Sequence, residues 1–156
     1  MLNVYRIVQK PFAKSAFTGA GSRQYPGRWN STGIPIVYTS GSVALATLEM
    51  LVHLNSEIDL FEYRLFRVGV PTDSIEIVAP KKLPKTWKQD NPTGAAQEFG
   101  TVWSLSTRSL ALCVPSVVVP HDSNYLLNPT HPDFALIEIG RPEKYTFDPR
   151  LFSRNL

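Results

Sequence analysis

Apolar side chains recur along the chain in short runs of strand character, separated by polar or glycine-rich segments. These runs are rich in β-branched and aromatic residues, as is typical of β-strands. They cover residues 2–8, 34–39, 60–70, 74–78, 110–119, 135–139 and 144–147. The run at 110–119 contains Pro115, so we expect an edge strand or a bulge there.

Two segments have the periodicity of α-helices. Residues 43–54 are apolar on almost every side, which predicts a buried helix, and Ser40, Gly41 and Ser42 before them offer an N-cap. Between residues 93 and 108 the apolar side chains recur at helical spacing. This spacing predicts a second helix.

Three segments show neither the pattern of a strand nor the periodicity of a helix. Residues 17–33 hold four of the nine glycines, interleaved with arginine and aromatic residues, a mixture that suits a ligand-binding loop. We expect the Lys- and Pro-rich residues 80–92 on the surface, and residues 121–133 as a polar loop. Strands outnumber helices without alternating strictly with them, so the pattern favours an α+β fold over a doubly wound parallel sheet.

Composition narrows the class of protein without choosing a function. A chain of 156 residues can bury a core of its own, so residues 1–156 are expected to form a single domain. The net charge of +3 mildly favours an anionic ligand or an acidic partner. The lone Cys113 excludes an intramolecular disulfide, and no apolar run approaches a membrane span, so we expect a cytoplasmic protein. The usual glycine-rich nucleotide loops are absent from the sequence.

Glu49 is the first candidate for chemistry, because it lies in the middle of the apolar helix. A lone carboxylate in such a place is costly to desolvate unless it is paired or reaches an opening. His53 lies four residues later on the same helical face and could pair with it, which would give both residues a structural role. A carboxylate that lines a cleft is the alternative.

Arg28 is the second candidate, in the sequence Gly27-Arg28-Trp29-Asn30. Glycine lets the backbone turn there, and a planar guanidinium can grip a phosphate or carboxylate with two hydrogen bonds. Stacking of an exposed arginine on Trp29 is the local alternative. Ser116 lacks the G-x-S-x-G surroundings of a nucleophilic serine, so we expect it to hydrogen-bond a ligand or a sheet edge.

Two further groups of polar residues are set aside. His121 and His131 have Asp122 and Asp133 nearby, but their spacing fits no zinc pattern, so no metal is expected. Lysines around Trp87 could follow a nucleic-acid backbone, but the prolines among them and the low total charge favour a solvated loop. These are Lys81, Lys82, Lys85 and Lys88. A non-catalytic nucleic-acid-binding regulator is therefore a weaker alternative.

Six segments of the chain, in this order, together resemble the RES domain family, which is named for an Arg, a Glu and a Ser. They are Val4-Tyr5-Arg6-Ile7, Gly27-Arg28-Trp29-Asn30, Val37-Tyr38, Ala44-Leu45-Ala46-Thr47-Leu48-Glu49, Val114-Pro115-Ser116 and Asn124-Tyr125-Leu126-Leu127-Asn128-Pro129. The resemblance spans most of the chain. In order and setting, the three residues of the family name fall on Arg28, Glu49 and Ser116.

The resemblance implies a fold similar to the ADP-ribosyltransferases of the diphtheria-toxin type, with NAD as the substrate in a cleft. It implies the toxin of a toxin–antitoxin system, which degrades NAD by hydrolysis or phosphorolysis, or transfers ADP-ribose to a cellular protein. The implied partner is an Xre-class antitoxin whose helix-turn-helix makes the DNA contacts. A homodimer of the toxin is expected within the complex.

The chemistry of NAD cleavage suits the candidate residues. Departure of neutral nicotinamide builds positive charge on the ribose, so the site needs a fixed anion there and cations on the diphosphate. Glu49 is the expected anion, and Arg28 and Arg6 are the expected cations. Other side chains are expected to border the nicotinamide or to hydrogen-bond the ligand. These are Tyr5, Tyr38, Ser116 and Asn124.

Overall fold

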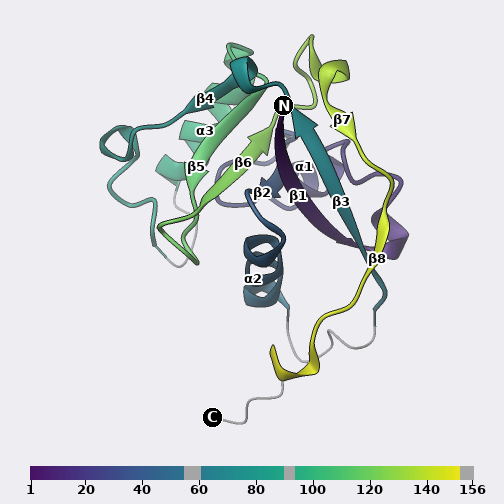
Figure 1. Cartoon of the computed structure of the whole chain (residues 1–156). Helices are drawn as coiled ribbons and strands as arrows, with labels where there is room; N and C mark the ends of the chain where they lie inside the picture. Colours follow the sequence, from purple (N-terminus) through teal and green to yellow (C-terminus); the bar gives the residue numbers. More distant parts are fainter. Residues whose placement is uncertain (55–60, 90–93, 152–156) are drawn as a thin grey trace.

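A curled mixed sheet forms the frame of the molecule (Figure 1). The computed structural model describes residues 1–54, 61–89 and 94–151. The strands lie in the order β4-β5-β6-β2-β1-β3-β7, with β8 also paired to β3. Their bounds are β1 (Leu2–Gln9), β2 (Val37–Ser40), β3 (Tyr63–Val70), β4 (Ile75–Ile77), β5 (Ala111–Pro115), β6 (Ser123–Leu127), β7 (Glu138–Ile139) and β8 (Glu143–Tyr145). Only the β4–β5 pair is parallel among these described strands.

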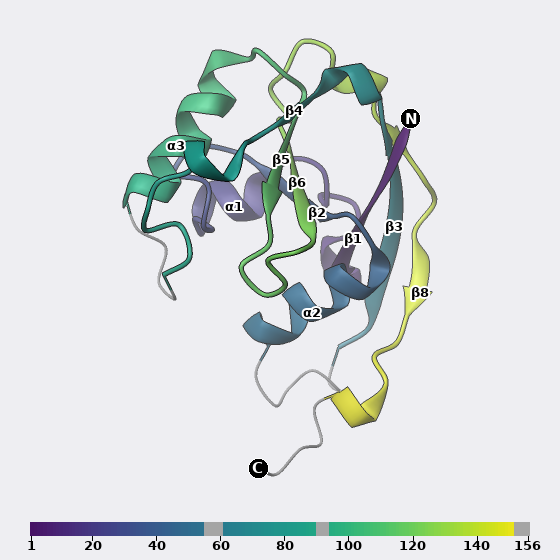
Figure 2. The ribbon, with the colours of Figure 1, turned by 60° about the vertical axis from the view of Figure 1, so that its left-hand side comes forward.

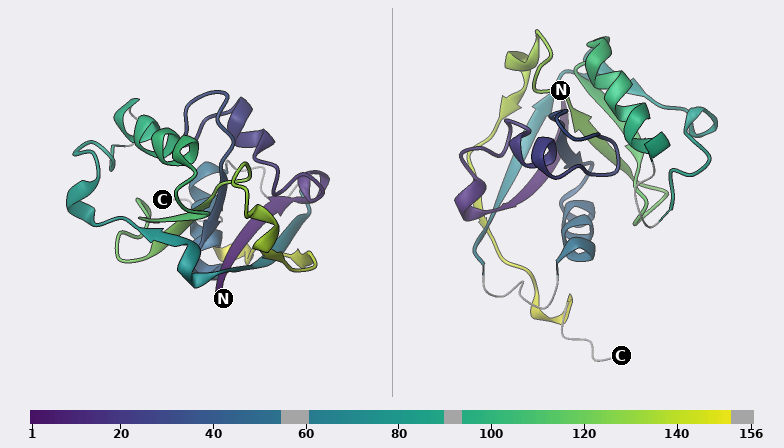
Figure 3. Two further views of the ribbon diagram at one scale, coloured as in Figure 1. Left: turned by 90° about the horizontal axis from the view of Figure 1, so that it is seen from above. Right: turned by 180° about the vertical axis from the view of Figure 1, so that it is seen from behind.

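The helices are α1 (Ala20–Gln24), α2 (Val43–His53) and α3 (Gly94–Ser106), with short 3-10 turns between the strands. The Ser42 hydroxyl caps α2 by accepting a hydrogen bond from the Leu45 amide at 3.0 Å. In the right-hand view of Figure 3, α3 lies beside β5 at the upper right, and α2 lies lower down beyond the end of β2. No helix in the described part of the chain is long and apolar enough to cross a bilayer.

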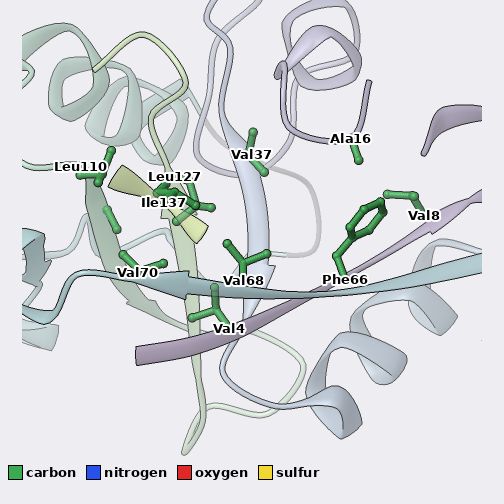
Figure 4. Close-up of a cluster of buried hydrophobic side chains, with 11 residues drawn as sticks. Val4, Val8, Ala16, Val37, Phe66, Val68, Val70, Leu110, Leu127 and Ile137 are labelled. Atoms are coloured by element: carbon green, nitrogen blue, oxygen red, sulfur yellow. The ribbon is translucent and has the colours of Figure 1, made fainter. Parts of the chain in front are cut away.

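The buried side chains form three clusters, one on one face of the sheet and two on the other, because successive side chains of a strand point to opposite faces. Val4, Val37 and Val68 belong to the cluster in Figure 4, which residues 13–17 help to cover. On the other face, Trp103 of α3 packs with Leu112 and Leu126. Ala46 of α2 packs with Ile7 and Tyr63 in a third cluster. Helices α2 and α3 therefore cover different parts of the sheet.

The sheet is weakest where β1 meets β2. Tyr5 and Ser40 form the one residue pair between these strands, whereas β1 and β3 pair along their whole length. The Arg6 side chain lies at this junction and donates a hydrogen bond to the Tyr38 carbonyl at 2.7 Å. The Arg6 side chain thus adds a hydrogen bond between β1 and β2 where their backbones are not paired.

Two of the predictions about strands are wrong. Residues 121–133, predicted as a polar loop, contain β6, which lies inside the sheet between β5 and β2. Because β6 begins with the polar residues Ser123 and Asn124, the sequence pattern did not indicate a strand there, although its last residues are buried. The run at 110–119 is not an edge strand, because β4 lies outside β5, and β5 has no bulge, because Ala111 to Pro115 pair with β6 in unbroken register. Pro115 is tolerated because it is the last residue of β5.

Other expectations are confirmed in part. Both long helices and the strands beginning near residues 2, 34, 60 and 74 exist, although Leu60 and Thr93 lie outside the described residues. Helix α2 is less buried than predicted, because Ala44, Leu48 and Val52 are exposed. The predicted loop 17–33 includes α1. In the connection after Pro80, Leu83 and Trp87 are buried.

Candidate active site

Helix α2 lies beside the connection between β5 and β6 (Figure 2). Glu49 lies near the middle of this helix, one turn after the buried Leu45, and is hydrogen-bonded to residues at both ends of that connection. Its Oε1 accepts one hydrogen bond from the Ser116 hydroxyl, at 2.7 Å, and another from the Asn124 side-chain amide, at 2.6 Å. No described residue donates to Oε2. His53 is exposed and forms no ion pair with Glu49 in this part of the structure. Neutral donors hold the carboxylate and leave one oxygen for a ligand.

The two donors are themselves fixed by the sheet. Ser116 follows β5 directly, is 0% exposed, and its oxygen accepts a hydrogen bond from the Val119 amide at 3.0 Å. Asn124 pairs with Ser40 across β6 and β2, and its Oδ1 accepts a hydrogen bond from the Ser40 hydroxyl at 2.8 Å. That bond turns the amide nitrogen of Asn124 towards Glu49. Strand β2 thus contributes to the orientation of an acid on α2.

Arg28 is held at its far end by the segment that follows β4. Its Nη1 donates to the carbonyls of Trp87, at 2.8 Å, and Gln89, at 2.7 Å. Trp29 is buried and stacks on Trp87, with ring centroids 6.2 Å apart, so the predicted alternative of an exposed arginine on Trp29 is wrong. The remaining guanidinium N–H groups have no partner among the described residues. They are free to donate to an anion.

Tyr38 of β2 is hydrogen-bonded to residues 27–30, which we call the arginine loop. Its hydroxyl donates to Asn30 Oδ1 at 2.6 Å and accepts a hydrogen bond from the Trp29 amide at 3.0 Å. Burial raises the pKa of Tyr38, and the Trp29 amide and the charge of Arg28 oppose this rise. A Cβ at Gly27 would lie 2.8 Å from the tyrosine oxygen, so only glycine fits there. The hydroxyl is used within the loop, and the ring packs against the buried cluster that contains Trp29 and Leu126.

Neighbouring residues of β1 point to opposite faces, which separates Tyr5 from Arg6. Tyr5 pairs with Ser40 and packs in the cluster under α2, on the same face as Tyr38 and Asn124. Arg6 faces the other way, and burial lowers the pKa of its guanidinium to about 10. Its enclosed Nε has no partner among the described residues. The structure does not bring Arg6 to the carboxylate of Glu49.

The described side chains thus form one polar group around Glu49, with Ser116 and Asn124, and a second around Arg28 and Tyr38 on the same face of the sheet. Two contributors, Ser40 and Asn30, were given no binding or positioning role from the sequence. Asn30 stands in the quoted Gly27-Arg28-Trp29-Asn30 motif, and an asparagine in a glycine-rich loop often satisfies nearby backbone groups, which is a usable signal. Ser40 carries no such signal, because its partner lies 84 residues away.

Other parts of the surface contribute little to this site. The lysines at 81, 82, 85 and 88 are exposed, but Trp87 is buried and therefore does not offer a face for stacking bases. Hollows of about 600 and 260 Å³ are lined by neither Glu49 nor Arg28. Within the described chain, no three His, Cys, Asp or Glu residues are grouped to hold a metal. The polar network therefore distinguishes the candidate site.

Known toxins are similar in sequence to this chain over most of its length. A Yersinia enterocolitica protein named Toxin Res is 39% identical over 149 residues, which cover 95% of this chain and 98% of that protein. A Sphingobium protein named Prs ADP-ribosylating toxin is 40% identical over 141 residues, which cover 88% of this chain and 87% of that protein.

A solved structure shares the fold. The match is to a chain of the M. tuberculosis MbcT–MbcA toxin–antitoxin complex, with a TM-score of 0.73 and 18% identity over 92% of this chain and 84% of that chain. The family model described as RES domain matches residues 3–148. The resemblance inferred from the six segments is confirmed, and the chain belongs to the RES domain family.

Proposed function

We propose that this chain is the toxin of a toxin–antitoxin system and that it consumes NAD by breaking the bond between nicotinamide and ribose. The observation that carries the proposal is the carboxylate of Glu49, with Oε1 held by Ser116 and Asn124 and Oε2 open. The name Toxin Res of two relatives supports the role of a toxin, and the name Prs ADP-ribosylating toxin of a third supports cleavage of the same bond.

The proposed chemistry depends on a negative charge fixed beside the ribose. As the C1′–N bond breaks, its electron pair leaves with nicotinamide, and the sugar becomes positively charged. Oε2 of Glu49 accepts a ribose hydroxyl and stabilises that charge, because neutral donors on Oε1 orient the carboxylate without cancelling its charge. Water then bonds to C1′ and releases a proton to the solvent, or an anionic oxygen of phosphate bonds to C1′ without losing a proton.

The remaining residues bind the rest of the dinucleotide. The free N–H groups of Arg28 donate to the diphosphate, and the rings of Tyr38 and Tyr5 border the nicotinamide. Ser116 and Asn124 act on the ligand through Glu49. Arg6 supports the site from the opposite face, because it holds the Tyr38 carbonyl.

The experiment compares the wild-type chain with Glu49→Gln. Glutamine keeps an oxygen that can accept the hydrogen bonds of Ser116 and Asn124, so the variant folds, but it carries no charge. We expect NAD consumption by the purified variant to fall by about a hundredfold or more, with loss of growth inhibition on expression.

Glu98→Gln is the matched control, since Glu98 is an exposed residue of α3, and it should retain full activity. Full activity in a folded Glu49→Gln protein would contradict the role of Glu49. A wild-type chain that leaves NAD intact, both alone and with phosphate or bacterial lysate, would overturn the proposed function.

Transfer of ADP-ribose to a protein is the second candidate. The name of the Sphingobium relative favours it, and the transfer uses the same bond cleavage with a protein side chain in place of water. Incubation with lysate and NAD labelled in the adenylate half distinguishes the two reactions. Labelled protein indicates transfer, and label found only in small products indicates hydrolysis or phosphorolysis.

An antitoxin partner is part of the same proposal, supported by the toxin–antitoxin complex that contains the structural neighbour. We propose an Xre-class antitoxin and a homodimer of this chain within the complex. Co-expression with the product of the adjacent gene, followed by light scattering, measures both. A partner without a helix-turn-helix, or a complex with a single copy of this chain, would contradict these expectations.

A further inference from the structure

Asn30 lies directly behind the loop that carries Arg28 and is 0% exposed. Its Oδ1 accepts hydrogen bonds from the Gly27 amide, at 2.9 Å, and from the Tyr38 hydroxyl, at 2.6 Å. Its Nδ2 donates to the carbonyls of Ser22, at 2.7 Å, Ile34, at 3.0 Å, and Ser31, at 3.4 Å. One side chain therefore joins both ends of the loop to β2.

The acceptor side of Asn30 fixes the residues on either side of Arg28. Gly27 is bound directly, and the Trp29 amide is bound through the Tyr38 hydroxyl. The missing side chain of Gly27 lets Tyr38 come this close. Since the guanidinium is tied to the carbonyls of Trp87 and Gln89, Arg28 is held at its backbone and at its tip.

We propose that Asn30 is a positioning residue, which sets where the guanidinium of Arg28 lies, and so sets the affinity for the diphosphate of a dinucleotide. The inference rests on the proposed function in assigning that ligand. The diphosphate keeps its charge throughout the reaction, so Arg28 binds the ground state and the transition state alike. Its displacement then raises KM and changes kcat little.

The test compares Asn30→Ala with Asn128→Ala. Asn128 is also 0% exposed, donates to the Ser104 carbonyl, and accepts hydrogen bonds from the amide and hydroxyl of Thr130. Both substitutions leave buried polar groups unpaired, so we expect comparable falls in unfolding temperature. Only Asn30→Ala should raise the KM for NAD, by about tenfold, with kcat within about threefold of the wild type.

Two further variants separate positioning from general stability. Asn30→Asp keeps an oxygen that accepts from Gly27 and Tyr38, so it should recover part of the lost affinity. In an Arg28→Ala background, the added Asn30→Ala should leave KM unchanged, because the residue acts through Arg28. An equal rise of KM in Asn128→Ala, or an additive effect in the double variant, would overturn the inference.

A failure of the proposed function is recognised separately, as a wild-type chain that neither consumes nor binds NAD. The position of the loop is then read from near-ultraviolet circular dichroism of the stacked Trp29–Trp87 pair, which flanks Arg28. Asn30→Ala should change this signal and Asn128→Ala should not. An unchanged near-ultraviolet signal in folded Asn30→Ala would contradict the positioning role of Asn30.

Discussion

The carboxylate of Glu49 receives its hydrogen bonds from a hydroxyl and an amide, and not from a basic side chain. A cation in contact would reduce the negative potential available to a positively charged ribose, whereas neutral donors orient the carboxylate and preserve its charge. In the same way, the Tyr38 hydroxyl is hydrogen-bonded to two uncharged groups, the Asn30 side chain and the Trp29 amide. At this scale, the sheet and the loop hold the charged groups through polar uncharged neighbours.

Tyr125 gives a pH dependence that can be checked. Burial, followed by the neighbouring thiol of Cys113, raises the pKa of Tyr125 from 10.0 to about 12. A raised pKa contributes stability that is complete below pH 10 and is lost as the pH rises through the folded value, because the unfolded chain loses the proton first. We expect the free energy of unfolding in urea to fall more between about pH 8 and 11 in the wild type than in Tyr125→Phe.

The comparison between these two proteins isolates Tyr125. Arg6 acts in the opposite direction, because burial lowers its pKa from 12.5 to about 10, so the destabilisation from its buried charge decreases as the pH rises above 10. Arg6 and Tyr38 are present in both proteins, so their contributions cancel in the difference. Equal alkaline losses in the two proteins would show that Tyr125 keeps an ordinary pKa.

At the scale of elements, periodicity predicted both long helices and most strands, but not which strands become neighbours. Strand β6 was missed because its first residues are polar, and those residues include Asn124, which donates to Glu49. The separations of 67 and 75 residues between Glu49 and its donors depend on this strand order, which no local pattern contains. Glu49 was identified because it conflicts with its apolar helix. Ser116 was expected to hydrogen-bond a ligand or a sheet edge, and Asn124 was identified only through the family resemblance.

Gly100 tests how α3 packs on the arginine loop. A Cβ at this residue would lie 1.8 Å from the Trp29 carbonyl oxygen, so Gly100→Ala forces the helix and the loop apart. We expect a loss of about 3 kcal/mol in the free energy of unfolding, at the upper end of ordinary overpacking. Urea denaturation measures it, and the KM for NAD should rise as well because Trp29 adjoins Arg28.

Gly94→Ala is the control for this prediction, in the same helix. Nothing lies within 4 Å of a Cβ at Gly94, which is exposed. Alanine there should stabilise α3 by about 0.5 kcal/mol or leave it unchanged. If Gly100→Ala were as stable as Gly94→Ala, the close contact between α3 and Trp29 would be wrong.

At the scale of the whole molecule, the sheet curls so that strands far apart in sequence contribute to one face, and residues 145–147 near the end of the described chain pack against α2. The order of the predicted strands and helices indicated an α+β protein, but the curl and the position of β8 depend on long-range pairing. Phe147 is buried against Tyr63 and Tyr145, with centroids 4.8 and 5.1 Å apart. Tyr145 in turn hydrogen-bonds the hydroxyl of Thr47 in α2. The C-terminal segment therefore anchors the helix that carries Glu49.

Phe147→Ala tests this anchoring. Removal of a buried aromatic side chain should lower the free energy of unfolding by about 3–5 kcal/mol, whereas Phe12→Ala, at a residue 59% exposed, should change it by less than about 0.5 kcal/mol. Since α2 loses part of its support, we also expect slower NAD consumption at temperatures where Phe147→Ala remains folded, as checked by circular dichroism. A variant that is destabilised but fully active would mean that the sheet, with Ser116 and Asn124, holds Glu49 in position without this anchor. The C-terminal segment would then stabilise the fold without acting on the site.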